Sequence, residues 1–130
     1  MLVGSCHCGS CSWSYSEKPD FARTCNCSVC RRYGVLWAYG TEGNNVSVSG
    51  VTQTYVRAEA IEFHFCSTCA CVVCWRLQNR ENVDNPAIAV NLRLAEPQEL
   101  SAIPLEEFDG QNTFKVLPRD GRCVLDVMFT

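Results

Sequence analysis

The chain has 130 residues, of which 47% are apolar, and a formal net charge of -3 at pH 7. This length suits one modest core, so we expect a single domain over residues 1–130. The 11 basic residues form no cluster longer than Arg31-Arg32, and no apolar run reaches the roughly 20 residues of a membrane span, so neither nucleic acid nor membrane is an expected partner. The composition leaves the oligomeric state open.

Turn-forming residues divide the chain into short segments, most of which have the alternation or the β-branched and aromatic content of strands. In chain order, strands are expected around 11–15 and at 35–39, 51–57, 61–65, 72–77, 88–94 and 124–129. Only 97–103 is typical of a helix, because it opens with proline and an early acid. We therefore predict a mainly β, antiparallel fold with one or two short helices and with its cysteine motifs at strand ends and turns.

Eleven cysteines are the most unusual feature of the composition. Their number is odd, and the N-terminal sequence lacks the basic and apolar segments of a signal peptide. Because cytosolic thiols are kept reduced, these features favour metal binding over disulfides and predict a cytoplasmic location. Isolated cysteines are commonly small buried hydrophobes, so clustering is what indicates ligands.

Two cysteine motifs far apart in the sequence can supply one closed metal site. Their members are Cys6, Cys8, Cys66 and Cys69. Tetrahedral zinc holds thiolates at about 2.3 Å, which puts neighbouring sulfurs roughly 3.8 Å apart. The C-x-C motif reaches this spacing only if the chain turns, and Gly4 and Gly9 flank it where a turn would need them. We expect a structural zinc on these four cysteines, contributing on the order of 10 kcal/mol to folding.

A third motif places Cys25, Cys27 and Cys30 within six residues. Three protein ligands with an open fourth position are typical of a zinc that performs chemistry or binds a thiol. These cysteines are therefore the candidate catalytic residues, acting through a second Zn2+. His7 or His64 could instead supply a fourth ligand, and the site would then be structural.

These motifs, in this order and at this spacing, resemble the glutathione-dependent formaldehyde-activating enzyme family, which includes the centromere protein V relatives. The segments that carry the resemblance are Gly4-Ser5-Cys6-His7-Cys8-Gly9, Cys25-x-Cys27-Ser28-x-Cys30-Arg31-Arg32 and Phe65-Cys66-x-x-Cys69. Asn91-Leu92-Arg93-Leu94 and Phe108-Asp109-Gly110 also resemble the C-terminal pattern of one branch. The resemblance implies the Mss4-like fold, called a β-tent, with one structural zinc and a second zinc where members are thought to engage the glutathione thiol.

For the activity, the resemblance implies a zinc-dependent carbon-sulfur lyase of the S-hydroxymethylglutathione synthase type, acting on a glutathione-aldehyde adduct. Zinc lowers the pKa of a bound thiol and so prepares a nucleophile for the aldehyde carbon. Arg31 and Arg32 are the candidate partners of the glutathione carboxylates, or else a solvated surface pair. Trp37 and Tyr39 could form a pocket wall or belong to the core. The alternative function is a non-catalytic, zinc-stabilised module that binds glutathione or another protein.

The sequence departs from the family pattern at several positions. Ala70 stands where glycine is usual after the second C-x-x-C motif, and Asn26 stands where histidine is frequent. The turn after Cys69 and the polarity around the second site are therefore in question. Four further cysteines lie outside the pattern, and those within the apolar run 71–75 are interpreted as buried thiols. The four are Cys11, Cys71, Cys74 and Cys123.

Overall fold

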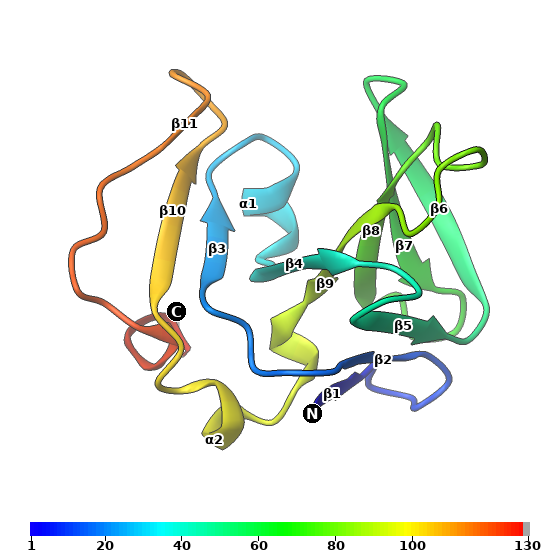
Figure 1. Cartoon of the computed structure of the whole chain (residues 1–130), viewed down its shortest axis with the longest axis horizontal. Helices are drawn as coiled ribbons and strands as arrows, with labels where there is room; N and C mark the ends of the chain where they lie inside the picture. Colours follow the sequence, from blue (N-terminus) through cyan, green and yellow to red (C-terminus); the bar gives the residue numbers. More distant parts are fainter. Residues whose placement is uncertain (129–130) are drawn as a thin grey trace.

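The computed structural model describes residues 1–128 and contains two β-sheets (Figure 1). The smaller sheet is antiparallel, in the order β1 (Leu2–Ser5), β2 (Ser12–Tyr15) and β5 (Val46–Ser49). The larger sheet has the order β11-β10-β3-β4-β9-β8-β7-β6, and only its β10-β3 pair is parallel. Its strands are β3 (Ala22–Cys25), β4 (Trp37–Thr41), β6 (Thr52–Arg57), β7 (Ile61–Cys66), β8 (Val72–Leu77), β9 (Ala87–Asn91), β10 (Leu105–Asp109) and β11 (Lys115–Val116). The mainly β prediction is confirmed.

The helical segments are all short. They are α1 (Cys30–Tyr33), α2 (Pro97–Leu100) and the 3-10 turns η1 (Leu92–Leu94) and η2 (Val124–Val127). The predicted helix start at Pro97 is confirmed, although α2 is shorter than the expected 97–103. Within residues 1–128, no helix has both the length and the apolar character needed to cross a membrane.

The predicted strands at 51–57, 61–65 and 72–77 are confirmed to within one residue. The expected strand at 88–94 ends early, because the Asn91 side chain accepts a hydrogen bond from the Arg93 N–H and caps η1. The predicted strand at 124–129 is wrong for the described part of that range. There the Asp126 carboxylate accepts the Cys123 N–H at 2.9 Å and caps the 3-10 turn η2. Residue 129 lies outside the described residues.

Both faces of the larger sheet carry buried apolar side chains, because successive residues of its central strands point to opposite sides. On β4, Ala38 packs into the core between the two sheets, whereas Trp37 and Tyr39 pack on the other side. Ile88 and Ala89 of β9 are divided in the same way. Two separate apolar clusters result, and the second one surrounds a candidate site.

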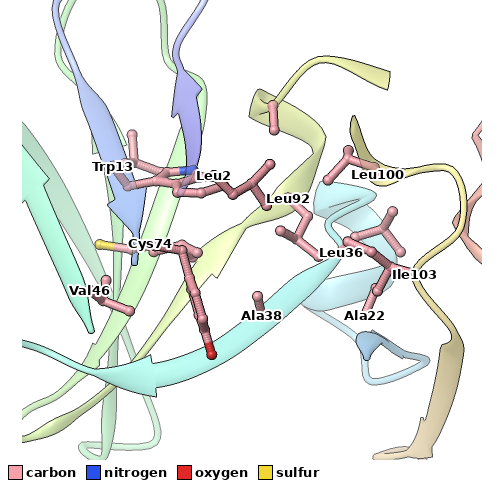
Figure 2. Close-up of a cluster of buried hydrophobic side chains, with 14 of the residues drawn as sticks. Leu2, Trp13, Ala22, Leu36, Ala38, Val46, Cys74, Leu92, Leu100 and Ile103 are labelled. Carbon is pink, nitrogen blue, oxygen red and sulfur yellow. The ribbon is translucent and has the colours of Figure 1, made fainter. Parts of the chain in front are cut away.

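The core between the sheets is centred on large side chains of the N-terminal strands and the β4-β9 pair. Figure 2 shows Trp13 beside Leu2, with Leu36 and Leu92 next to them along the same cluster. The Trp13 indole Nε1–H donates to the Asn91 carbonyl at 3.1 Å, so this buried ring leaves no unpaired donor. The smaller sheet is thereby held against β9.

Gly4 has a different role from the one predicted. It lies within β1, directly opposite Trp13 in the ladder, and not in a turn. A Cβ atom at this position would overlap the Trp13 ring. Close packing against the indole therefore requires glycine here, while the turn of the C-x-C motif uses Gly9.

We expect Gly4→Ala to lower the free energy of unfolding by about 1–3 kcal/mol, because the added methyl group must displace the buried Trp13 ring. Val3→Ala on the same strand is the matched control, since the Val3 side chain is exposed, and its effect should stay within about 0.5 kcal/mol. Urea unfolding followed by tryptophan fluorescence measures both. Equal stability of the two variants would contradict the packing argument.

Candidate metal centres

Four cysteine sulfurs from two distant parts of the chain meet at one centre. Cys8 Sγ lies 3.7 Å from Cys6 Sγ and 3.6 Å from Cys66 Sγ. With Cys69 included, all four sulfurs lie within 4.8 Å of one another. The two shorter distances match the edge of about 3.8 Å that tetrahedral zinc imposes on four thiolates. The four cysteines predicted for the first site could therefore hold one metal ion.

The two segments that carry these cysteines, 6–11 and 66–71, have the same pattern of backbone hydrogen bonds. The Cys6 N–H donates to the Cys11 carbonyl and the Cys66 N–H to the Cys71 carbonyl, each at 2.9 Å. Backbone donors also point at the sulfurs: the Cys11 N–H lies 3.2 Å from Cys6 Sγ. The N–H of Cys71 is the main cause that lowers the pKa of Cys69 to about 5. Each of these donors favours the thiolate of the sulfur that it contacts, which is the form that binds metal, whereas burial raises the pKa of Cys6.

Each segment turns through a residue with positive φ. Gly9 has φ of 84°, and its N–H donates to the Cys6 carbonyl at 3.1 Å. Ala70 has φ of 67°, and its N–H donates to the Cys66 carbonyl at 2.9 Å. The left-handed conformation costs a non-glycine residue about 1–2 kcal/mol, which explains why glycine suits the position that Ala70 occupies.

Two of the four cysteines outside the clusters are buried in the core. Cys11 is fully buried, its thiol donates to the Val51 carbonyl at 3.3 Å, and burial raises its pKa to about 12. Cys74 is also fully buried, and burial raises its pKa to about 11. Cys71 and Cys123 are half-buried. The buried-thiol interpretation therefore holds for Cys74, while Cys71 lies at the edge of the first centre.

The second cluster forms where β3 ends and α1 begins. The sulfurs of Cys25, Cys27 and Cys30 lie within 4.8 Å of one another. The Cys30 N–H donates to Cys27 Sγ, and the Trp37 indole N–H donates to Cys30 Sγ, both at 3.4 Å. The hydrogen bond from the Cys30 thiol is the main cause that lowers the pKa of Cys25 to about 5. This all-sulfur donor set fits a soft or borderline metal ion such as zinc.

Within residues 1–128, no other histidine, cysteine or carboxylate joins this second cluster. His64 is buried on β7, where its ring nitrogens contact Thr52 Oγ1 at 3.0 Å and Glu62 Oε1 at 3.2 Å. His7 is exposed, and its backbone N–H donates to the sulfur of Cys71 near the first centre. Neither histidine supplies a fourth ligand, so the geometry favours the open form of the site.

The three cysteines of the second cluster line a cavity of about 300 Å³. Most of its wall is formed by aromatic and aliphatic side chains from β4, β7, β8, β10, the β10-β11 turn and the residue that precedes α1. They are Val29, Trp37, Tyr39, Ile61, Phe63, Trp75, Phe108 and Phe114. Trp37 and Tyr39 thus line the cavity and also belong to the second apolar cluster, so the two interpretations of these residues are not exclusive.

The turn after β10 packs directly on the second cluster. Parallel pairing of β10 with β3 places Phe108 opposite Cys25. The Asn26 amide donates to the Asp109 carboxylate at 3.0 Å, and this bond is the main cause that lowers the pKa of Asp109 to about 2. A Cβ at Gly110 would lie 2.8 Å from Cys25 Sγ, so a larger residue does not fit there. Asn26 therefore holds this turn against the cluster through its hydrogen bond to Asp109. In the family that the sequence resembles, histidine is frequent at this position.

Two arginines that the sequence did not single out line the same cavity. Arg23 is ion-paired with Glu106, and its guanidinium lies 4.6 Å from the centre of the Tyr39 ring. Arg57, at the end of β6, is half-buried and makes no ion pair or hydrogen bond through its side chain within the described part of the chain. Arg57 therefore has a guanidinium free to bind a ligand.

The structure places the predicted Arg31 and Arg32 on the exposed surface of α1. Arg32 lines an outer hollow together with Tyr33, Tyr55 and Arg57, and its guanidinium donates to the Ser28 carbonyl at 2.8 Å. Arg57 and Val29 line both this outer hollow and the cavity, so the two spaces adjoin. Arg31 lines neither of them.

Comparison with known proteins identifies a family and solved structures of similar fold. A family model described as glutathione-dependent formaldehyde-activating enzyme matches residues 1–104, which include all seven clustered cysteines. No curated protein matches the chain. A crystal structure of a Rhodobacter sphaeroides protein is similar, with a TM-score of 0.60 and 24% identity, and covers 80% of this chain and 99% of that chain. This likeness shows a shared fold.

We expect Cys66→Ser to abolish metal binding at the first centre and to lower the free energy of unfolding by more than about 3 kcal/mol, because a closed site contributes directly to folding. Cys30→Ser should release metal from the second cluster with a smaller loss of melting temperature. Zinc content by mass spectrometry and thermal unfolding measure these effects, with the half-buried Cys123→Ser as the control. A Cys66→Ser protein that keeps its full zinc content and melting temperature would refute the assignment.

Ala70→Gly should raise the free energy of unfolding by about 0.5–1 kcal/mol, because glycine adopts the positive φ of this turn without strain. Ala102→Gly provides the control, since Ala102 is exposed, does not have a positive φ, and should become slightly less stable. Thermal unfolding of the zinc-loaded proteins compares the two variants. A destabilised Ala70→Gly variant would show that the turn does not carry this strain.

Proposed function

The chain belongs to the glutathione-dependent formaldehyde-activating enzyme family, and from this premise we propose that it is a zinc-dependent carbon-sulfur lyase acting on a glutathione-aldehyde adduct. The observation that carries the proposal is the three-cysteine cluster, which lines a cavity and has no fourth protein ligand among residues 1–128. Such a donor set leaves one position of a tetrahedral metal ion for a substrate atom.

In this proposal, Cys25, Cys27 and Cys30 hold the zinc of the second site. The structural zinc would be held by Cys6, Cys8, Cys66 and Cys69. Zinc at the second site would lower the pKa of a coordinated thiol and so keep it ionised at neutral pH. The indole donor of Trp37, 3.4 Å from Cys30 Sγ, helps to keep negative charge on the cysteine sulfur and fixes the orientation of the cluster.

We place the peptide part of glutathione in the outer hollow. Its polar groups are the Arg32 and Arg57 guanidinium groups and the side chains of Tyr33 and Tyr55. Guanidinium groups bind carboxylates through charge-assisted and often bidentate hydrogen bonds. We assign the carboxylates of glutathione to Arg57 and Arg32 because both border this hollow.

The proposed reaction is an addition to a carbonyl group and its reverse. The thiolate sulfur donates an electron pair to the aldehyde carbon and a carbon-sulfur bond forms. The π bond of the carbonyl breaks, and its oxygen gains that electron pair and a proton from solvent, which replaces the proton that the thiol released on ionisation. In the reverse direction the hydroxyl proton leaves, the carbonyl re-forms, and the carbon-sulfur bond breaks. The aromatic wall around the cysteines limits the access of water, which strengthens polar interactions inside.

We also propose that the protein works in the cytoplasm. None of the eleven cysteines forms a disulfide in the structure, and a reducing compartment keeps cysteines in this state. Cytosolic glutathione would supply the co-substrate.

Calorimetric titration tests the proposed thiol ligand. Glutathione should bind the zinc-loaded protein at least about tenfold more tightly than S-methylglutathione, which cannot form a thiolate. Cys30→Ser should remove this difference, whereas Cys123→Ser should keep it. Equal affinity for the two ligands would exclude the metal from binding and would overturn the proposal.

Turnover is measured separately, by following adduct formation or breakdown above the spontaneous rate. An enzyme should accelerate the reaction, and Cys30→Ser should abolish the acceleration. Binding of glutathione without acceleration would identify the protein as a glutathione-binding module.

A further inference from the structure

We propose that the aldehyde in the adduct is larger than formaldehyde and carries an apolar substituent of aromatic or branched aliphatic size. This substituent would occupy the cavity beside Cys25, Cys27 and Cys30. The inference rests on the proposed function and adds to it the class of aldehyde.

The first argument is the size of the cavity. Its volume is about 300 Å³, and all three cysteines of the second cluster line it. A water molecule occupies about 30 Å³ of liquid, and the hydroxymethyl group derived from formaldehyde is only slightly larger. A one-carbon substituent would therefore leave most of this space unfilled, whereas a phenyl or branched alkyl group would fill much of it.

The second argument is the chemistry of the wall. Phe63 and Trp37 are almost completely buried there, and the Trp37 indole N–H is already bonded to Cys30 Sγ. Arg23 is neutralised by its ion pair with Glu106. Arg57 lies where the cavity adjoins the outer hollow, and peptide amides of glutathione placed against the rest of this wall would lose their hydrogen bonds to water without replacement. An apolar substituent carries no such cost and gains from burial.

The third argument is that a polar space adjoins the apolar one. Arg57 and Val29 line both spaces, so a ligand whose sulfur lies at the cysteines can extend in two directions. The charged peptide suits the outer hollow with its arginines and tyrosines, which leaves the aromatic cavity for the group attached to sulfur. With the peptide in the outer hollow and the substituent in the cavity, the ligand would occupy both spaces.

The wall is also rigid, as specificity for a shaped substituent requires. The Tyr39 and Trp75 rings pack edge to face with centroids 5.7 Å apart, and those of Tyr33 and Phe63 with centroids 5.3 Å apart. Such pairs hold each other in place and present ring faces and edges to an entering ring. A flat aromatic group would therefore be preferred over a long flexible chain.

Calorimetry on the zinc-loaded protein tests this inference without requiring turnover. S-benzylglutathione should bind at least about tenfold more tightly than S-methylglutathione, because its ring is buried in the cavity. Ile61→Trp, which places bulk in the cavity, should reduce this ratio to about one. Leu77→Trp is the matched control, because Leu77 pairs with Ile61 across the ladder but is exposed and does not line the cavity, and it should keep the ratio.

Steady-state kinetics gives a second, independent readout. The kcat/KM for the glutathione adduct of phenylacetaldehyde should exceed that for the formaldehyde adduct at least about tenfold, as expected when a ring is buried in the transition state. The comparison of S-benzylglutathione with S-methylglutathione and the comparison of the two adducts both use the wild-type protein. They therefore remain valid tests even if Ile61→Trp fails to fold.

The results separate this inference from the proposed function. If S-benzylglutathione binds no better than S-methylglutathione while glutathione still binds through Cys30, the inference on aldehyde size is overturned and the proposed function stands. If glutathione and S-methylglutathione bind equally and no adduct is turned over, the proposed function fails, and the inference fails with it.

Discussion

The spacing of the four sulfurs at the first centre is the constraint on which much of the structure depends. Cys8 Sγ lies 3.6–3.7 Å from Cys66 Sγ and Cys6 Sγ, a separation that joins the arm after β1 to the turn between β7 and β8. The smaller sheet is thereby tied to the larger one, and the core around Trp13 closes between them (Figure 2). The backbone donors around these sulfurs favour thiolates in the same place, so local hydrogen bonding and long-range packing support one geometry.

Closing this core leaves the other face of the larger sheet available for a site. Because side chains alternate along a strand, the residues that stabilise the core, such as Ala38, are neighbours of those that form the cavity, such as Trp37. The site is therefore built on rigid central strands and shares their stability. α1 lies beside β3 (Figure 1). Its first residue, Cys30, belongs to the same apolar cluster as Trp37 and Phe63, so the second metal cluster lies against the aromatic wall.

The surroundings of the second cluster divide into an apolar and a polar part. Phe63 and Trp37 form an apolar wall near the sulfurs, while Arg57 and Arg32 border the adjoining hollow. The β10-β11 turn, held by the Asn26-Asp109 hydrogen bond, closes the remaining side. This separation suits a ligand whose sulfur carries a charged peptide on one side and an apolar group on the other. The shape of the two spaces is therefore consistent with the proposed function.

Features that depend on near neighbours could be predicted from the sequence alone. The individual cysteine motifs, the turn at Gly9 and the strands from 52 to 77 follow from spacing and alternation within short segments. The first centre joins two distant motifs, and it could be predicted because four thiolates complete a tetrahedral zinc site. Features that depend on distant pairing could not. The parallel β10-β3 pair places Phe108 at Cys25, and no local pattern encodes a partner more than 80 residues away. For the same reason the sequence pointed to Arg31, next to the cysteines along the chain, whereas the tertiary structure places Arg57 beside the cavity because β6 ends there.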